Sequence, residues 1–404
     1  TPSSRGLGDV YKRQGKRIYT PKEMVRLMTL PNDYKMTGDY NDKGARIGLM
    51  VAPLQVYYIV EEIKKQILEP MEITANKDLG FKETFDKWNG KWLDETSYDT
   101  VVSSIGVKDD IIKVYKPSGS LFDKPILACI VKNAYTGDTY QQVKDTLYSI
   151  DDVSTMRANA AGPIDPEEMK KRGLIEGKDY VLRTPNSYYP LKKNGEFNRI
   201  ASANAIHSVL IGYKRGRFTG MIGASGWMEK KANKPKYEIL KNIAIENEKA
   251  LKKGVPEVWK LQRNFADECI EKQYQIGGAP ITALSANRYS SEGTAKMSAH
   301  LDGKDLEFGL TTMCVFRIGN FGGAYLCFPR YGIAIEADDG DVLIADSNEL
   351  HGVTPITGDG VRLSCVAYCD EHVATKGQAG KSEKPIGPHA SKYEEKGSLE
   401  SFLV

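Results

Sequence analysis

The chain of 404 residues has few histidines and cysteines, no long apolar run and almost no net charge. None of its apolar runs approaches the roughly 20 residues that a membrane-spanning helix needs, so we expect no membrane partner. The formal net charge is only +3, so a basic surface for a partner must be local. With five histidines in the whole chain, each one carries more information than usual.

The six cysteines form no Cys-x-x-Cys pair and lie mostly within apolar, strand-like runs. A disulfide framework would need paired cysteines in a secreted chain. We therefore expect reduced, buried thiols in a cytoplasmic protein, in a microbe or in the host cytoplasm of a virus, that is not secreted.

The first fourteen residues, TPSSRGLGDVYKRQ, lack the apolar core of a secretory signal. The stretch from Ser4 to Gln14 resembles the translation of a transposase sequencing adapter read in frame. We interpret residues 1–14 as an adapter remnant, which implies a metagenomic source and a natural N-terminus that was lost. This stretch is therefore excluded from the fold prediction.

The rest of the sequence divides into four regions that differ in composition and residue pattern. Residues 15–190 mix helical and strand-like patterns, and residues 191–276 are basic and helix-containing. Residues 277–372 are short β-rich runs separated by glycine-containing turns, and residues 373–404 are a polar tail. The pattern predicts an α+β protein with a jelly-roll core, flanking helices and an N-terminal α/β elaboration.

Individual elements follow from local signals. Apolar spacing predicts helices in "PLQVYYIVEEIKKQILEP" and "TYQQVKDTLYSI", and Pro166 is expected to begin another. Two further helices should be separated at Gly254-Val255-Pro256. The expected core strands are Thr311–Ile318, Ala324–Phe328, Gly332–Ala337, Val342–Asp346 and Val361–Tyr368.

A basic stretch runs from Lys214 to Lys241, with eight Lys or Arg against two Glu and several aromatic residues between them. It is either a solvated surface with aromatic residues in the core, or a nucleic-acid contact with stacking side chains. The candidate nucleic-acid contacts are Lys214, Arg215, Arg217, Lys230 and Lys231.

The chemistry-bearing residues lie in the β-rich region. His300 and Asp302 are two positions apart, so an extended segment places both side chains on one face. His351 follows a predicted strand and can return to the same rim. Two histidines and one carboxylate on one side of a metal form the facial triad of non-haem Fe(II) oxygenases, although zinc accepts the same ligands.

A second group of polar residues alternates along two strands. Arg362 lies eleven positions beyond His351, and Ser364 shares its face; upstream, Asn287 and Tyr289 alternate in the same way. A fixed guanidinium and hydroxyls inside a barrel suit the far carboxylate of a dicarboxylic co-substrate. A His-x-Asp pair or a strand arginine can be purely structural, but their joint order in one region favours the catalytic interpretation.

Residues 277–372 resemble the Fe(II)/2-oxoglutarate dioxygenases, in particular the ten-eleven-translocation and base-J-binding branch that hydroxylates thymidine or methylcytosine. The similarity rests on "NRY…MSAHLD", "GNFGGAYLCFPRYGIAIEADDGDVLIADSNELHGVTP" and "GVRLS". The order Asn-x-Tyr before His-x-Asp is also similar to AlkB-type repair dioxygenases.

The resemblance implies that His300, Asp302 and His351 bind Fe(II). It also implies that Arg362 holds 2-oxoglutarate with help from Ser364, Tyr289 or Asn287, which are then contacts of the co-substrate. O₂ is then the oxidant, and ascorbate is the alternative co-substrate because one algal relative type uses it.

The implied activity is hydroxylation of the methyl group of a 5-methylpyrimidine, methylcytosine or thymine, in DNA. A base within a duplex must be flipped out to reach such a site. Two alternatives stay open: the same chemistry on an amino acid, a peptidyl residue or a small molecule, and a non-catalytic barrel that binds a ligand.

Overall fold

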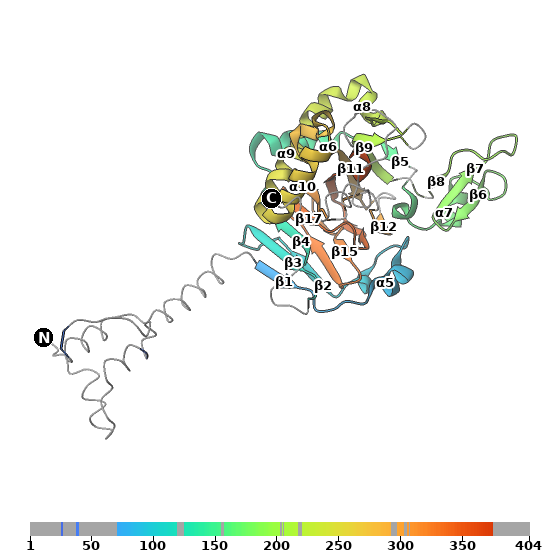
Figure 1. Ribbon diagram of the computed structural model, residues 1–404. Helices are drawn as coiled ribbons and strands as arrows, with labels where there is room; N and C mark the ends of the chain where they lie inside the picture. Colours follow the sequence, from blue (N-terminus) through green and yellow to red (C-terminus); the bar gives the residue numbers. More distant parts are fainter. Residues whose placement is uncertain are drawn as a thin grey trace. The chain divides into compact units, whose positions relative to one another are not determined.

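The computed structural model (Figure 1) describes a defined part of the chain. The described residues are 26, 38–39, 71–118, 125–154, 157–202, 204, 206–216, 220–291, 297–302, 305–306 and 308–374. The chain divides into two units, Thr1–Glu69 and Pro70–Val404, and every element named below belongs to the second. Three stretches lie outside the described residues: residues 1–14, which we interpreted as an adapter remnant, the predicted helix in residues 53–70, and the tail beyond residue 374.

The larger of the two main sheets has ten strands. Its strands, in spatial order, are β1 (Met71–Thr74), β3 (Ile111–Tyr115), β4 (Ile126–Val131), β17 (Val342–Ala345), β13 (Thr311–Ile318), β20 (Val361–Tyr368), β11 (Ala283–Ser290), β9 (Ile206–Arg215) and β10 (Ile222–Ala224), with β5 (Val153–Ser154) paired to β9. All neighbours are antiparallel except β1 and β3.

The smaller main sheet has five strands. They are β12 (Met297–His300), β18 (His351–Val353), β15 (Leu326–Phe328), β16 (Ile333–Glu336) and β2 (Thr100–Ser103). A two-stranded ribbon of β14 (Phe321–Gly323) and β19 (Ile356–Gly358) lies outside both sheets.

The eight core strands have the connectivity of a jelly roll. Numbered one to eight in chain order from β11, without β14 and β19, they are arranged 6-3-8-1 in the large sheet and 2-7-4-5 in the small one. The chain thus alternates between two antiparallel sheets, as in a double-stranded β-helix. The predicted α+β fold with this core is confirmed, and β2, β3 and β4, from before residue 190, extend the same two sheets.

Two apolar cores lie on opposite faces of the large sheet. Successive residues of a strand point to opposite faces, so Cys314 and Phe316 pack with the helices, whereas Met313 and Val315 face the small sheet. The fold therefore has three layers: helices, large sheet and small sheet. The space between the two sheets is where a jelly roll can hold a ligand.

Six α-helices lie in the described part of the second unit, and the sequence predicted four of them, all but the first and the fourth. They are α5 (Phe81–Trp88), α6 (Gly137–Tyr148), α7 (Pro166–Lys171), α8 (Gly226–Glu229), α9 (Lys234–Gly254) and α10 (Pro256–Cys269). Short 3-10 turns are η2 (Glu95–Ser97), η3 (Ala158–Ala161), η4 (Lys231–Asn233), η5 (Lys272–Tyr274), η6 (Ile276–Gly278) and η7 (Glu371–Val373). Among the described residues, no helix is long and apolar enough to cross a membrane.

The break between α9 and α10 is where the sequence predicted it. Pro256 begins α10, and the residue before it, Val255, leaves the helical region at φ −141° and ψ 69° because the proline ring disfavours helical geometry there. Pro166 likewise begins α7, and the Asp165 side chain accepts hydrogen bonds from two backbone N–H groups of its first turn.

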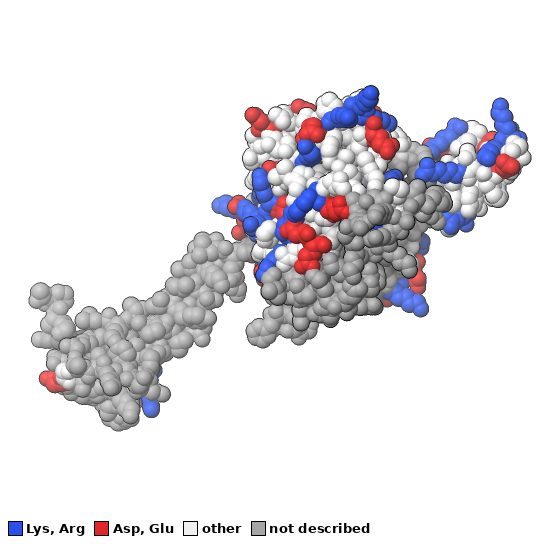
Figure 2. All heavy atoms as spheres, turned by 45° about the horizontal axis from the view of Figure 1, so that its top comes forward, with Lys and Arg blue, Asp and Glu red and all other residues white. Residues whose placement is uncertain are grey.

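A small lobe is inserted between η3 and β9. Its three-stranded sheet consists of β6 (Tyr180–Thr184), β7 (Ser187–Pro190) and β8 (Ala201–Ser202), and α7 precedes it. The lobe projects from the main sheets beside β12 (Figure 1), and Lys and Arg side chains are prominent on it in Figure 2.

Candidate metal centre

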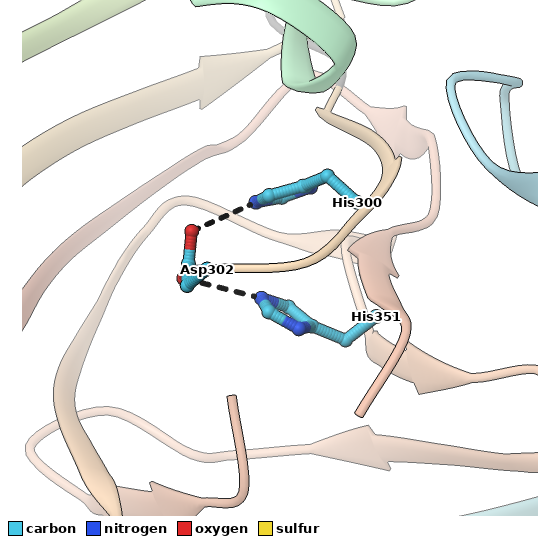
Figure 3. A group of neighbouring side chains, drawn as sticks. All are labelled: His300, Asp302 and His351. Atoms are coloured by element: carbon cyan, nitrogen blue, oxygen red, sulfur yellow. Dashed lines mark ion pairs between the residues drawn. The ribbon is translucent and has the colours of Figure 1, made fainter. Parts of the chain in front are cut away.

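Two adjacent strands of the small sheet bring the predicted triad together. His300 is the last residue of β12 and His351 is the first of β18, and the two residues are paired in register. Asp302 follows two residues after His300, and one possible ligand atom from each of the three lies within 4.8 Å of the others. Figure 3 shows both imidazole rings turned toward the Asp302 carboxylate.

Hydrogen bonds to the backbone fix the orientation of both rings. Nδ1 of His300 lies 2.7 Å from the carbonyl oxygen of Ser298, and Nδ1 of His351 lies 2.9 Å from that of Glu349. Because a carbonyl oxygen only accepts, Nδ1 carries the hydrogen in each ring, and Nε2 keeps its lone pair. Metal-binding histidines are commonly oriented in this way.

The triad has the donor set of a cation site. The Nε2 atoms of His300 and His351 lie 3.6 and 3.5 Å from oxygens of Asp302. Two lone pairs and a carboxylate repel one another unless a cation lies between them, so these residues fit a divalent metal. Both histidine side chains are largely buried, with exposed fractions of 13% and 11%, which limits the access of water.

Burial and the close contact among the three residues also determine the direction of their pKa shifts. Burial lowers the pKa of His300. Burial also opposes the charged form of His351, but the adjacent Asp302 carboxylate favours it, and the pKa of His351 is raised. Burial alone would raise the pKa of Asp302, yet the adjacent histidines hold it well below its usual range. The carboxylate thus stays ionised and attracts a cation.

The triad opens into a cavity of about 540 Å³ between the two sheets. Apolar side chains such as Phe328, Leu343 and Val366 line much of it, together with polar side chains from both sheets. Asp305 lies on the same wall, where burial and the charge of Asp302 raise its pKa to about 8. A mostly apolar chamber with a few convergent polar groups is typical of a small-molecule site.

The four residues predicted to contact a co-substrate lie on neighbouring strands. Asn287 pairs with Ser364, and Tyr289 pairs with Arg362, in the register of β11 and β20. Their side chains share one face of the large sheet because they alternate along each strand. The structure therefore brings these four residues together, and Asn287 and Tyr289 also line the cavity.

Arg362 is a buried cation that has no acidic partner among the described residues. Its side chain donates to the Ser364 hydroxyl at 3.2 Å and approaches the Met313 sulfur at 3.7 Å, and its guanidinium lies 5.4 Å from the Tyr289 ring centre. Only 4% of the residue is exposed, and burial lowers its pKa. A buried guanidinium without an anion is costly, so this place favours an anionic ligand.

The structure adds a second cavity cation that the sequence did not predict. Arg157, which precedes η3, lines the cavity and donates to the hydroxyls of Ser208 and Ser285. The Ser208 hydroxyl in turn donates to the Asn287 side chain at 2.6 Å. Arg157 lies more than a hundred residues before His300 in a loop-rich stretch, so no local pattern marks it.

The basic stretch predicted to contact nucleic acid is only partly exposed. Lys214, Lys230 and Lys231 are exposed, whereas the Arg215 guanidinium donates to the carbonyl oxygen of His372. Arg217 lies outside the described residues. Of the aromatic residues in this stretch, Trp227 is buried in the apolar core, and Tyr213 and Tyr237 are partly buried against it. Phe218 lies outside the described residues. The role of the basic residues in this stretch stays a prediction.

Comparison with known proteins gives a family match over the core. Residues 229–371 match the family model described as the oxygenase domain of the 2OGFeDO superfamily, of the Tet/JBP type. The match begins at the end of α8 and includes the triad, Arg362 and Ser364.

Two curated relatives and one solved structure are similar to this chain. Thymine dioxygenase JBP1 of Trypanosoma brucei brucei is 25% identical over 164 residues, which are 37% of this chain and 18% of that protein. Thymine dioxygenase JBP1 of Leishmania major is 30% identical over 118 residues, 28% of this chain and 13% of that protein. The matched part thus spans less than a fifth of these relatives. The structure of NgTET1 in complex with 5mC DNA has a TM-score of 0.43 and 14% identity, and covers 70% of this chain and 87% of that one.

Proposed function

We propose that the chain, which contains an oxygenase domain of the TET/JBP type, is an Fe(II)- and 2-oxoglutarate-dependent dioxygenase that hydroxylates the methyl group of a 5-methylpyrimidine in DNA. The observation that carries the proposal is a cation site and an anion site at the same cavity. The triad of His300, Asp302 and His351 lines the cavity and fits a cation. The buried Arg362 contacts two cavity-lining residues, Met313 and Tyr289, and favours an anion.

In this proposal the triad holds iron through the two Nε2 atoms and a carboxylate oxygen of Asp302. Two histidines and one carboxylate on one side leave the opposite coordination positions open for other ligands. When bound, Fe(II) with 2-oxoglutarate and O₂ supplies the oxidising chemistry for an unactivated C–H bond and releases succinate and CO₂. The chain fixes the geometry: the carbonyls of Ser298 and Glu349 orient the rings, and the chamber excludes water.

Arg362 binds the far carboxylate of 2-oxoglutarate in this arrangement, next to the hydroxyls of Ser364 and Tyr289. The Met313 sulfur lies against the guanidinium, so the carboxylate must displace it; the flexible, unbranched methionine side chain permits such a movement. Ascorbate, an enediol lactone, has no carboxylate to offer Arg362. The buried guanidinium therefore favours 2-oxoglutarate over ascorbate.

The proposed substrate follows from the chamber and from the relatives. The curated relatives that this chain matches are named thymine dioxygenases. Since the histidines lie inside the cavity, with little of either side chain exposed, a reacting methyl group must enter it. A base that is stacked in a duplex cannot do so, and the target nucleotide must be flipped out.

Nucleoside analysis after turnover tests the proposal. The protein is incubated with Fe(II), 2-oxoglutarate, O₂ and DNA that contains either 5-methylcytosine or thymine as the sole 5-methylpyrimidine. Mass spectrometry of the digested DNA should then show a nucleoside heavier by one oxygen, and His300→Ala should abolish both this product and succinate. Protein digests and free amino acids serve as competing substrates.

Two results would contradict the proposal. In the first, succinate forms and a peptide or amino acid is oxidised while the DNA stays unmodified. The chemistry would then be as proposed, but the substrate would not be DNA. A folded wild-type protein that forms no succinate with any substrate would favour a barrel that only binds its ligand.

A further inference from the structure

The lobe of residues 163–202 is attached directly to the rim of the cavity. The buried Asn186 side chain donates to the carbonyl oxygen of Gly90 at 2.7 Å, and the Gly90 N–H donates to Ala299 of β12. Asn204, just after the lobe, donates to the carbonyl oxygen of Ala161 in η3. The lobe is thus joined to β12, which carries His300, and to η3, whose residues line the cavity.

An exposed aromatic pair lies on a hairpin of this lobe. The ring of Phe197 is stacked on that of Tyr189, with 5.1 Å between the centroids and 27° between the planes. Phe197 is 61% exposed, more than any other large hydrophobic residue in the described part of the chain. Leu191 and Phe197 form a β-bridge that closes this hairpin. An apolar ring held in the open by strand pairing is available to a partner.

The same hairpin and its neighbouring strands are basic. Residues 178–199 contain five Lys or Arg against two Asp or Glu, and all five cations are exposed: Lys178, Arg183, Lys192, Lys193 and Arg199. Asp179, one of the two acids, accepts a hydrogen bond from a backbone N–H of its own turn. The other, Glu196, forms an exposed ion pair with Lys192, which contributes little. Exposed cations therefore outnumber acids along the hairpin and its neighbouring strands.

We infer that the β6–β8 lobe is a DNA-contacting surface, on which Phe197 stacks on an unpaired base and the surrounding lysines and arginines hold the flanking phosphates. Proteins that bind single strands combine exposed aromatic rings with cations in this way. The inference rests on the proposed DNA substrate. An unpaired base near the cavity rim is what flipping of the target nucleotide supplies.

The basic stretch from Lys214 to Lys241 is a poorer candidate for this contact. Trp227 is buried in the core, and Tyr213 and Tyr237 pack against it. Lys214 lies six residues along β9 from Ser208, about 20 Å at 3.3 Å per residue, and the Ser208 hydroxyl donates to the cavity-lining Asn287. The helix α9 packs on the face of the large sheet that points away from the cavity. DNA held there would not present its base to the triad.

Three matched lysine pairs test the inference. The double variant K192A/K193A changes the lobe, K230A/K231A changes the competing stretch, and K252A/K253A changes two exposed lysines at the end of α9. Binding of a duplex oligonucleotide with one 5-methylcytosine is measured by fluorescence anisotropy at several salt concentrations. The protein carries Mn(II) and 2-oxoglutarate, so that it binds DNA without turnover.

The K192A/K193A variant should bind DNA more weakly than the wild type. The slope of log affinity against log salt should become shallower by about 0.7–0.9 for each of these lysines that contacts a phosphate. Phe197→Ala should weaken binding by about 5- to 150-fold, the loss of one stacked base, and leave the slope unchanged. K252A/K253A should bind like the wild type. Thermal melting confirms that each variant is folded.

Failure of the inference is distinct from failure of the proposed function. If the wild type oxidises methylated DNA, and K230A/K231A rather than the lobe variants weakens binding, the lobe inference is overturned and the function stands. If the wild type neither binds nor oxidises DNA but still converts 2-oxoglutarate to succinate, both the DNA substrate and the lobe inference are wrong.

Discussion

Replacement of Arg362 by methionine should separate ligand binding from stability. The guanidinium is 4% exposed, and its contacts in the ligand-free chain are the Ser364 hydroxyl, the Met313 sulfur and the Tyr289 ring. Removal of one partner from a buried, hydrogen-bonded charge pair costs about 2–5 kcal/mol. The dissociation constant of 2-oxoglutarate should therefore rise by roughly 30-fold or more.

The same substitution should not destabilise the protein without its ligands. Arg362 is a buried cation with no carboxylate partner in the described part of the chain, and methionine fills a similar volume without a desolvation cost. We expect the melting temperature of Arg362→Met to equal or exceed that of the wild type. In the wild type, 2-oxoglutarate at a hundred times its dissociation constant stabilises by about 2.7 kcal/mol, a rise of about 3–4 °C.

The assay is differential scanning fluorimetry with Mn(II), with and without 2-oxoglutarate, beside calorimetric titration. Arg362→Lys keeps the charge but loses the two-pronged geometry, so its affinity should lie between those of the wild type and the methionine variant. The reasoning is refuted if Arg362→Met binds 2-oxoglutarate as the wild type does. It is also refuted if that variant melts several degrees lower without ligand, which would make the guanidinium structural.

Three further predictions concern the core and the second cation. Native protein at pH 8 should react with iodoacetamide only after unfolding, since burial raises the pKa of three thiols to about 12: Cys129, Cys314 and Cys327; rapid labelling of the folded chain would contradict this. Gly254→Ala should lower the free energy of unfolding by about 1–3 kcal/mol in urea, because its Cβ would lie 2.9 Å from the Cys129 sulfur; an unchanged midpoint would show that the helix can shift. Arg157→Gln should weaken 2-oxoglutarate binding about tenfold in the same titration, the loss of a charge-assisted hydrogen bond, without a change in melting temperature; unchanged affinity would place Arg157 outside the anion site.

The sequence predicted the core well where local patterns were long. The strands Thr311–Ile318 and Val361–Tyr368 have the expected bounds, because eight residues of apolar, β-branched sequence leave little ambiguity. The strand that begins at His351 is only three residues long and was missed. The pairing of β2 with β16 joins segments more than two hundred residues apart, which no local signal specifies.

Some residues of the candidate site could be predicted from the sequence, and others could not. The order of His300, Asp302 and His351 predicted a group that the structure brings together: the two histidines are paired in register, and Asp302 follows just after the end of β12. Arg157 was not predicted because it reaches the cavity from a distant loop. The aromatic residues of the basic stretch, such as Trp227, were open to two interpretations, and burial of the ring depends on tertiary packing that charge counts do not report.

Anaerobic titration of the wild-type protein with Fe(II) and then 2-oxoglutarate tests the central claim most directly. If the triad holds iron and Arg362 anchors the co-substrate, the weak visible charge-transfer band of the chelated metal should appear at one equivalent. It should be absent from His351→Ala. A correctly folded wild-type protein that shows no band at saturating iron and 2-oxoglutarate would contradict the account.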